Sequence, residues 1–266
     1  MQLKQIARDA LLRPLQAVSG IVERRHTLPI LANVRIEPSD GAVEFTATDL
    51  EMQITARSEC GAKAGAATTV SARKLHDLLR ALPEDASLNV DVSGSRMTVR
   101  AGRSRFNLQT LPAGDYPGIH PGTEKLQSLS LSQKSLRSLF RLVEFAMAQQ
   151  DIRYYLNGML LVIDRGSLQA VATDGHRLSW ASLAVDGDYT RQEVILPRKT
   201  VLELGKLLAE SDEPVSLDVL ANQVRFRFGA IELVSKVVDG KFPDYNRVIP
   251  RSEERRVGKE CRSRWS

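Results

Sequence analysis

Apolar residues recur along the chain at two different spacings, and these predict helices and strands in a repeated order. Four stretches place apolar residues three or four positions apart, which is the spacing of one face of an α-helix. The four apolar stripes are formed by Leu11, Leu15 and Val18; by Leu75, Leu78, Leu79 and Leu82; by Leu136, Leu139, Phe140 and Val143; and by Val201, Leu204 and Leu208. Pro14 lies inside the first stripe and is expected to kink or restart that helix.

Between these helices, apolar and polar residues alternate over short runs that predict β-strands. The runs cover residues 34–37, 43–47, 87–92, 96–101, 159–163, 168–173, 215–219 and 224–228. Turn-forming triplets, Ser39-Asp40-Gly41 and Asp164-Arg165-Gly166, separate neighbouring runs and predict hairpins.

An internal repeat with a period of 125 residues organises these elements. Leu31-Ala32-Asn33 aligns with Leu156-Asn157-Gly158, Ala47-Thr48-Asp49 with Ala172-Thr173-Asp174, and Ala72-Arg73-Lys74 with Pro197-Arg198-Lys199. At a slightly different offset, Asp115-Tyr116-Pro117-Gly118 resembles Phe242-Pro243-Asp244-Tyr245. A period of this size is a duplicated domain rather than a solenoid unit. We therefore expect an α+β protein with two tandem domains, 1–120 and 126–250, each with two helices packed on antiparallel sheet, and a linker over 117–127.

Composition narrows the class of protein. The chain has 266 residues, 42% of them hydrophobic and 26% charged, which suits two globular domains. We find neither a run of about 18 apolar residues nor a signal peptide, so the sequence predicts a cytoplasmic protein without a membrane partner. Cys60 and Cys261 are interpreted as free thiols. The histidines stand singly, without the paired spacing of a metal site, and no cofactor or metal is expected.

The net charge of +5 depends strongly on the last 16 residues. Six basic and three acidic residues within 251–266 account for +3 of it, which leaves +2 for the rest of the chain. This segment has no apolar periodicity and resembles the translation of a sequencing adapter, so we interpret it as non-native and exclude it from the fold. The alternative is a native basic tail that binds acidic partners. A nearly neutral body does not identify a DNA-binding protein by its global charge.

Long motifs shared with a known family change this picture. They are Thr27-Leu28-Pro29-Ile30-Leu31, Ala47-Thr48-Asp49-Leu50-Glu51, Gly102-Arg103-Ser104-Arg105-Phe106, Arg153-Tyr154-Tyr155-Leu156-Asn157-Gly158-Met159, Ala172-Thr173-Asp174-Gly175-His176-Arg177-Leu178 and Val238-Asp239-Gly240-Lys241-Phe242-Pro243-Asp244-Tyr245. In these motifs the chain resembles the beta sliding clamps, the processivity subunits of bacterial replicative polymerases (DNA polymerase III beta subunits). The resemblance runs from residue 1 to 250 and implies a homodimeric ring of three-domain chains around duplex DNA. It also implies that the third domain is absent here and that this fragment does not close the ring.

A clamp that slides must contact phosphates without reading bases, through modest and dispersed positive charge. The predicted helices carry such a distribution: Arg8, Arg13, Arg73, Lys74, Lys134, Arg137, Arg141, Arg198 and Lys199. The alternative for each residue is an ordinary solvated helix face. The resemblance adds Arg25 and the loop Gln150-Asp151-Ile152-Arg153-Tyr154 as DNA contacts. Tyr154 and Tyr155 are expected at a strand start, one packed inward and one facing solvent. Their functional interpretation is contact with phosphates or bases, with ordinary packing as the alternative for Tyr155.

The resemblance also implies a groove that binds short peptide motifs of the polymerase, the clamp loader and repair proteins. Its residues here would be Leu156, Thr173, Gly175, His176, Arg177, Leu178, Pro243, Arg247 and Val248. Their chemistry is suitable, because the apolar members can form a pocket for a hydrophobic side chain and the two arginines a polar rim.

Ring closure in the family implies an edge strand that pairs with a second subunit. The matching residues are Arg103, Arg105, Phe106 and Leu108. Alternation places Phe106 and Leu108 on one strand face, and an exposed apolar edge favours association. The alternative is a core strand.

Two other function classes are weaker. A hydrolase could use Asp174 and His176 as an acid–base pair, but Asp-Gly is a strong turn signal and the equivalent Asp49-Leu50-Glu51 lacks the histidine. No nucleophile motif or phosphate-binding loop accompanies the pair. A sequence-specific DNA reader would need a recognition helix or zinc fingers, and neither is visible. The sequence therefore predicts a protein that is not an enzyme.

Overall fold

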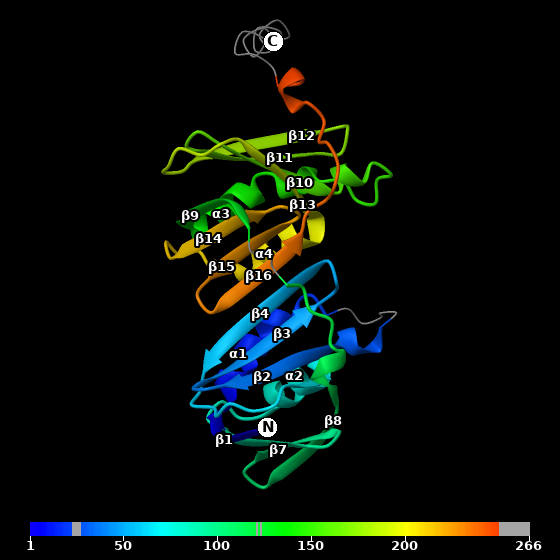
Figure 1. Ribbon diagram of the computed structural model, residues 1–266, viewed down its shortest axis with the longest axis vertical. Coiled ribbons are helices and arrows are strands. Elements are labelled where there is room, and N and C mark those ends of the chain that lie inside the picture. The colour runs from blue at the N-terminus through cyan, green and yellow to red at the C-terminus, as the bar shows by residue number, and fades with distance from the viewer. Residues whose placement is uncertain (23–27, 121, 123, 250–266) are drawn as a thin grey trace, which may run out of the picture.

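The computed structural model describes residues 1–22, 28–120, 122 and 124–249, and within them one order of elements occurs twice (Figure 1). The first copy comprises β1 (Gln2–Ala7), α1 (Arg8–Ser19), the 3₁₀ turn η1 (Pro29–Ala32), β2 (Asn33–Ser39), β3 (Ala42–Thr48), β4 (Met52–Glu59), β5 (Thr68–Ser71), α2 (Ala72–Ala81), β6 (Ser87–Ser93), β7 (Arg96–Ala101), β8 (Ser104–Pro112) and η2 (Ala113–Asp115). The second copy comprises β9 (Lys125–Ser132), α3 (Gln133–Arg141), η3 (Glu144–Ala146), η4 (Tyr154–Leu156), β10 (Gly158–Asp164), β11 (Ser167–Thr173), β12 (Leu178–Ala184), β13 (Gln192–Pro197), α4 (Arg198–Leu207), β14 (Pro214–Leu220), β15 (Gln223–Phe228), β16 (Ile231–Lys236) and η5 (Tyr245–Arg247).

Each copy forms two antiparallel four-stranded arrangements rather than one meandering sheet. The first copy has the orders β1-β6-β7-β8 and β5-β2-β3-β4, and the second has β9-β14-β15-β16 and β13-β10-β11-β12. Three of the four join into one sheet of twelve strands, because β8 also pairs with β5 and β4 pairs with β16. The predicted α+β class is confirmed. The alternation of apolar and polar residues did not reveal that the strands of each copy form two four-stranded arrangements.

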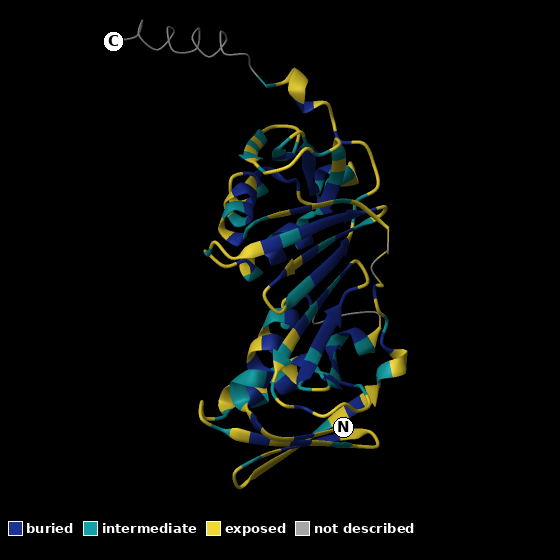
Figure 2. Ribbon diagram, turned by 60° about the vertical axis from the view of Figure 1, so that its left-hand side comes forward, coloured by how far each residue is buried: buried dark blue, intermediate teal, exposed yellow. Residues whose placement is uncertain are grey.

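The β4–β16 pairing is the junction between the copies. Ile54 lies directly opposite Leu233, and both side chains are fully buried in the same apolar core. Side chains opposite each other on paired strands share one sheet face. The cores of the two copies therefore lie on the same side of this shared sheet, and a band of buried residues runs through both (Figure 2).

The helices form where the periodic stripes predicted them. Ser71 and Ser132 cap α2 and α3, accepting hydrogen bonds from the amides of Lys74 and Ser135. The stripe residues Leu15, Leu79 and Leu136 are fully buried. In both copies the first helix contacts strands of both arrangements, α1 touching β1, β3 and β4 and α3 touching β9 and β12. No described helix is long and apolar enough to cross a membrane.

The structure corrects two local expectations in part. Of the two outcomes expected at Pro14, a kink or a restart, the restart is excluded, because one helix runs from Arg8 to Ser19 with Pro14 buried on its apolar face. Pro14 has no amide hydrogen to donate to the Ala10 carbonyl, so the helix continues past Pro14 with one backbone hydrogen bond fewer. The expected linker 117–127 overlaps β9, which begins at Lys125. Strand pairing with β14 extends that strand into a stretch whose composition suggested a loop.

The repeated Asp-Tyr word places a buried tyrosine near the end of each copy. Tyr116 donates a hydrogen bond to the Asn33 carbonyl and accepts one from the Thr48 amide, both at 3.2 Å. Burial raises the pKa of Tyr116 to about 12. Tyr245 is also buried, and its hydroxyl donates to Gln169 Oε1 at 3.3 Å.

Replacing Tyr116 with phenylalanine should lower the free energy of unfolding by about 1–2 kcal/mol, because the buried Thr48 amide would lose its acceptor. In the unchanged protein, stability should fall between about pH 10 and 12, since the unfolded phenol ionises near 10 and the folded one only near 12. Urea denaturation at pH 8 and 11 measures both effects. Tyr189→Phe is the control, because its bond to the Asp186 carbonyl is exposed. Equal losses for the two variants would contradict the assigned role of Tyr116.

Candidate functional site

The basic residues predicted to contact DNA lie mainly on the four helices, and most of them have a carboxylate partner. The side chain of Arg73 is 73% exposed and lies 3.7 Å from Asp77 one turn along α2. Lys74 and Lys134 are exposed. On α4, Lys199 donates to Asp49, which belongs to the β3–β4 turn of the first copy. These cations are dispersed over the helices of both copies, as predicted, but they are largely compensated.

On α3, Arg137 and Arg141 are four residues apart and therefore share one helix face. Both contact one carboxylate oxygen, Oε1 of Glu210, at 3.3 and 3.7 Å. Glu210 follows α4 in the chain and was not singled out from the sequence. Its partnership with α3 is a contact between distant segments, which no local pattern indicates.

Two helix cations have a different environment from the one expected. Only 11% of the Arg8 side chain is exposed, and it donates to the Leu82 carbonyl at 2.8 Å and pairs with Asp9. The prediction of an exposed Arg8 was therefore wrong, because α1 begins against the end of α2. Arg198 donates to the carbonyls of Glu144 and Met147, so it holds the η3 segment against α4. Arg25 lies outside the described residues.

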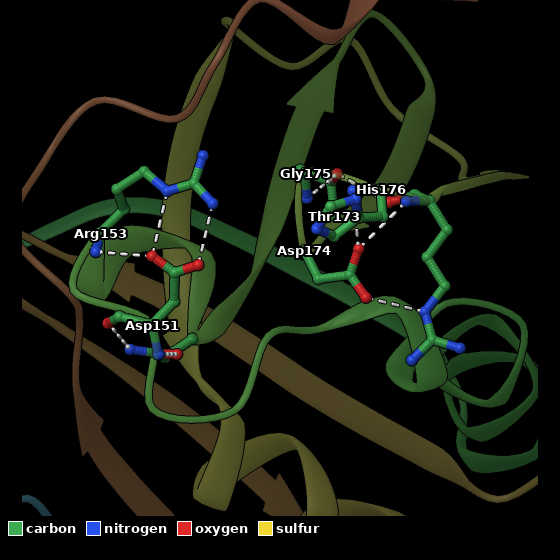
Figure 3. A network of polar contacts seen from close by, with 8 residues as sticks. Asp151, Arg153, Thr173, Asp174, Gly175 and His176 are labelled. Atoms are coloured by element: carbon green, nitrogen blue, oxygen red, sulfur yellow. Dashed lines mark hydrogen bonds and ion pairs between the residues drawn. The ribbon is translucent and has the colours of Figure 1, made fainter.

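The loop 148–157, which contains the segment 150–154 predicted from the resemblance to contact DNA, is closed by its own polar groups. Asn157 Oδ1 accepts from the Asp151 amide and its Nδ2 donates to the Asp151 carbonyl, both at 2.9 Å. Asp151 also holds the Arg153 guanidinium through two bonds, at 3.0 and 2.8 Å (Figure 3). These side-chain hydrogen bonds lower the pKa of Asp151 to about 2. Gln150 has a φ of 55°, so the loop turns sharply there.

Tyr154 and Tyr155 lie in the short helix η4 rather than at a strand start, which corrects the expected geometry. The expected difference in burial is nevertheless confirmed. Tyr154 is 57% exposed, whereas Tyr155 is half-buried against the apolar cluster beneath it. Their rings meet edge to face, with centroids 5.9 Å apart.

The turn 173–178 is shaped by one carboxylate. Asp174 Oδ1 accepts hydrogen bonds from the amides of His176 and Arg177, and Oδ2 accepts from Arg177 Nε (Figure 3). These bonds, those from the two amides above all, lower the pKa of Asp174. In the first copy Asp49 accepts from the amides of Glu51 and Met52 in the same way. The repeated Ala-Thr-Asp word is thus a turn signature.

This arrangement disfavours the hydrolase alternative. Asp174 binds the backbone amide of His176, and its second oxygen is occupied by Arg177. Within the described residues, no group of three His, Cys, Asp or Glu side chains is placed to hold a metal ion. Cys60 is a free thiol, and Cys261 lies outside the described part of the chain.

A small apolar cluster underlies the residues predicted to bind peptides. It comprises Ala148, Leu156, Leu160, Val162, Val171, Ile195, Phe242 and Tyr245, with Tyr155, Leu178, Val238 and Ile249 packed against it. Leu156 is only 1% exposed, so it supports the surface from below and does not line it as predicted. Leu178 is half-buried, and Val248 is 65% exposed. Phe242 and Tyr245 were missed, although they lie within the motif that contains Pro243.

Arginines surround this surface. The Arg177 guanidinium lies 5.7 Å from the centroid of the exposed Phe145 ring, within the range of a cation–π contact. Arg247 is paired with Asp244 at 2.9 Å. A methyl group at Gly175 would lie 3.2 Å from Nη2 of Arg153, so the loop 148–157 and the turn 173–178 touch. Gly175, His176 and Pro243 are exposed, and the Thr173 hydroxyl is used within the turn. The structure thus brings the loop 148–157, the turn 173–178 and the segment 242–245 together around Leu178.

The strand predicted for subunit association is an edge over part of its length. Residues 104–109 of β8 pair with β7, whereas only residues 110–112 pair with β5, so the second edge of 104–109 has no strand partner in the described chain. Phe106 is 37% exposed, Arg105 is exposed, and Leu108 is half-buried against the core. Arg103 lies in the preceding turn, not on the strand. The core-strand alternative fits Leu108 and not Phe106.

Comparison with known proteins identifies relatives along most of the chain. Residues 1–120 match the family model for the DNA polymerase III beta subunit, N-terminal domain, and residues 130–244 match the one for its central domain. The chain is 48% identical over 255 residues to a protein of Pseudomonas aeruginosa named beta sliding clamp, covering 95% of this chain and 69% of the relative. The beta sliding clamp of Escherichia coli is 43% identical over 257 residues, with 96% and 70% covered.

Solved structures agree with these matches. The DNA polymerase III subunit beta of Pseudomonas aeruginosa superimposes with a TM-score of 0.90 at 47% identity, covering 95% of this chain and 69% of that one. A sliding clamp of the same species bound to griselimycin has a TM-score of 0.89 at 45% identity, with 95% and 68% covered. Both structures share the arrangement of elements described above.

Proposed function

The chain belongs to the family of DNA polymerase III beta subunits, the beta sliding clamps, and from this we propose that its helix-bearing side faces duplex DNA while the surface around Leu178 binds peptides. Members of this family are processivity factors and not enzymes. Members of the family accordingly act in DNA replication by holding a polymerase on its template, without turning over a substrate, and this chain corresponds to their N-terminal and central domains.

The single observation that carries the proposal is the junction between β4 and β16. Because Ile54 and Leu233 share one buried sheet face, both helix-bearing cores lie on one side of a continuous sheet. Such a wall presents two helix pairs toward a common partner, and its hydrogen-bonded sheet supplies rigidity across the copies. Scattered cations on these helices contact phosphates of any sequence, which is what movement along DNA requires.

The DNA-facing set that we propose combines helix cations with the loop. It comprises Arg73, Lys74, Arg137, Arg141, Gln150, Arg153, Tyr154, Tyr155, Arg198 and Lys199, together with Arg25. Within it, Arg198 acts mainly by holding η3, and the exposed Tyr154 offers a ring and a hydroxyl to the backbone.

The peptide-binding surface is supported by the contact between exposed and buried apolar groups. Leu178 offers apolar contact above the platform of Leu156, Phe242 and Tyr245, and the exposed Val248 follows Tyr245 closely in the chain. Arg177 and Arg247 supply a charged rim. Short segments of the replicative polymerase, the clamp loader and repair proteins are the proposed occupants, because a few buried hydrophobic anchors give most of the affinity in such interfaces.

A third surface is proposed for assembly. The open edge of residues 104–109, with Phe106 and Arg105 exposed, is suited to pairing with a strand of the third domain of a second subunit in the homodimeric ring of the full-length form, which this fragment is not expected to close. The two domains, over 1–120 and 126–250, would then follow each other around that ring.

Replacing Leu178 with alanine should weaken binding of a synthetic peptide from the polymerase by about fivefold to thirtyfold, because roughly 1–2 kcal/mol of apolar contact is lost. Fluorescence anisotropy of the labelled peptide measures the dissociation constant, and circular dichroism checks the fold. Leu111→Ala is the matched control, since Leu111 is 42% exposed on β8 of the other copy. Unchanged peptide affinity in a folded Leu178→Ala variant would place the peptide elsewhere.

A further inference from the structure

Carboxylates accompany the cations of the proposed DNA-facing side, and one of them serves two arginines at once. Asp77 lies beside Arg73, and Asp151 holds Arg153. Glu210 differs from these, because its Oε1 lies within reach of both Arg137 and Arg141. A single acidic side chain thereby halves the net charge of this part of α3, from +2 to +1.

The position of Glu210 is imposed by the backbone around it. The Lys134 amide donates to the Ser211 carbonyl at 3.0 Å, and the Ala209 amide donates to Gln133 Oε1 at the same distance. Residues on both sides of Glu210 are thus bonded to the first turn of α3. These two hydrogen bonds keep the backbone of Glu210 beside the arginines, even though motion of its exposed side chain can break the ion pairs themselves.

Stability gives little reason for this arrangement. The side chains of Glu210 and Arg141 are each 65% exposed. Ion pairs that are this exposed contribute little to folding, because water and salt screen the attraction. The carboxylate instead affects any anion that approaches the arginines, since a phosphate group must compete with it for the same two guanidinium groups.

We propose that Glu210 limits the affinity of α3 for DNA phosphates, so that the chain stays on duplex DNA but can still move along it. The inference rests on the proposed function, in which α3 faces DNA. Each phosphate contact releases condensed counterions and steepens the dependence of binding on salt. An acid that neutralises one of two neighbouring arginines therefore weakens the contact and keeps movement along the duplex easy.

The test compares two variants that make the same charge change at different places. Glu210→Gln keeps the shape of the side chain and removes its charge. Glu37→Gln is the matched control: Glu37 pairs with Arg35 at 2.7 Å, and both residues alternate with the buried Val34 and Ile36 of β2, on the face away from the helices. Binding of the full chain to a labelled 30-base-pair duplex is measured by anisotropy across a series of salt concentrations.

Glu210→Gln should bind the duplex about threefold to tenfold more tightly at low salt, with a slope of log affinity against log salt that is steeper by about one. Glu37→Gln should remain within twofold of the unchanged chain. In an Arg141→Ala background the gain from Glu210→Gln should shrink, because one of its two partners is gone.

Three outcomes separate the inference from the proposed function. If Arg141→Ala weakens duplex binding but Glu210→Gln matches Glu37→Gln, α3 faces DNA and the proposed role of Glu210 is overturned. A gain from Glu210→Gln that is undiminished by Arg141→Ala also overturns it in its stated form. If Arg141→Ala leaves binding unchanged, the placement of α3 against DNA fails, and with it the basis of the inference.

Discussion

Replacing Gly158 with alanine should destabilise the second copy by about 2–4 kcal/mol, although it adds only one methyl group. A Cβ at this position would overlap the carbonyl oxygen of Leu196 and lie 2.9 Å from Cγ2 of Ile195. Gly158 opens β10 and lies opposite Pro197 on β13. The carbonyl belongs to a paired strand, so it moves only if the β10–β13 ladder moves with it.

Urea denaturation followed by circular dichroism measures this loss. Gly114→Ala is the matched control, because no heavy atom lies within 4 Å of a Cβ built there and its φ is not positive. That change should shift the free energy of unfolding by less than about 0.5 kcal/mol. A Gly158→Ala variant as stable as Gly114→Ala would mean that β10 and β13 are not packed as closely as described.

Replacing Asp218 with asparagine should cost about 3–5 kcal/mol at neutral pH, because it removes the charge that several cations share. The Asp218 side chain has no exposed surface, and its Oδ2 lies 2.7 Å from Arg225 Nη2 and 3.3 Å from both Lys125 and Arg227. Ser128 donates to Oδ1 at 2.7 Å. Arg225 is itself only 15% exposed, so the variant would leave a mostly buried cation without its carboxylate.

The dependence on pH gives a second measure of the same site. Burial alone would raise the pKa of Asp218, but hydrogen bonds from Ser128, Arg225 and Lys125 outweigh it and hold the pKa below its usual value. A group whose folded pKa is lowered stabilises the fold above the unfolded value of about 3.9, and that contribution is lost as the pH falls through the folded pKa.

Denaturation midpoints between pH 7 and 2.5 should therefore fall less steeply in Asp218→Asn than in the unchanged chain at the acid end. Asp212→Asn, on an exposed part of the loop after α4, is the control and should keep the full acid dependence. If Asp218→Asn were as stable as the control at pH 7, the cations would not depend on this carboxylate.

Much of the architecture could be predicted because it depends on local spacing that occurs twice. The stripes that include Leu75 and Leu136 became the apolar faces of α2 and α3, and the words around Asp49 and Asp174 became equivalent turns. Repetition also made the order of elements in one copy a check on the other. Strands β4 and β16 were missed. In β16 the buried polar Ser235 follows Leu233 and Val234, which breaks the alternation, whereas β4 alternates Met52, Ile54 and Ala56 with less buried polar residues and was overlooked.

The candidate site was predicted less completely. Residue types and motifs identified the segments that converge around Leu178, but they did not show that Leu156 is covered or that Phe242 and Tyr245 form the base. Arg8 was expected to be exposed, because a cation off the apolar stripe ordinarily faces water. Exposure depends on which neighbouring segment covers a side chain, and that is a property of contacts between distant parts of the chain.

By itself, the sequence determined the duplication, the helices with their caps and stripes, and the segments that carry the shared motifs. These depend on residues a few positions apart, whose spacing is already present in the unfolded chain. Only the tertiary structure decided that β4 pairs with β16, that Glu210 reaches two arginines of α3, and that Asp218 gathers three cations. The β4–β16 pairing, the contact of Glu210 with α3 and that of Lys125 with Asp218 join residues far apart in the chain, so they exist only once the packing of apolar faces has brought the segments together.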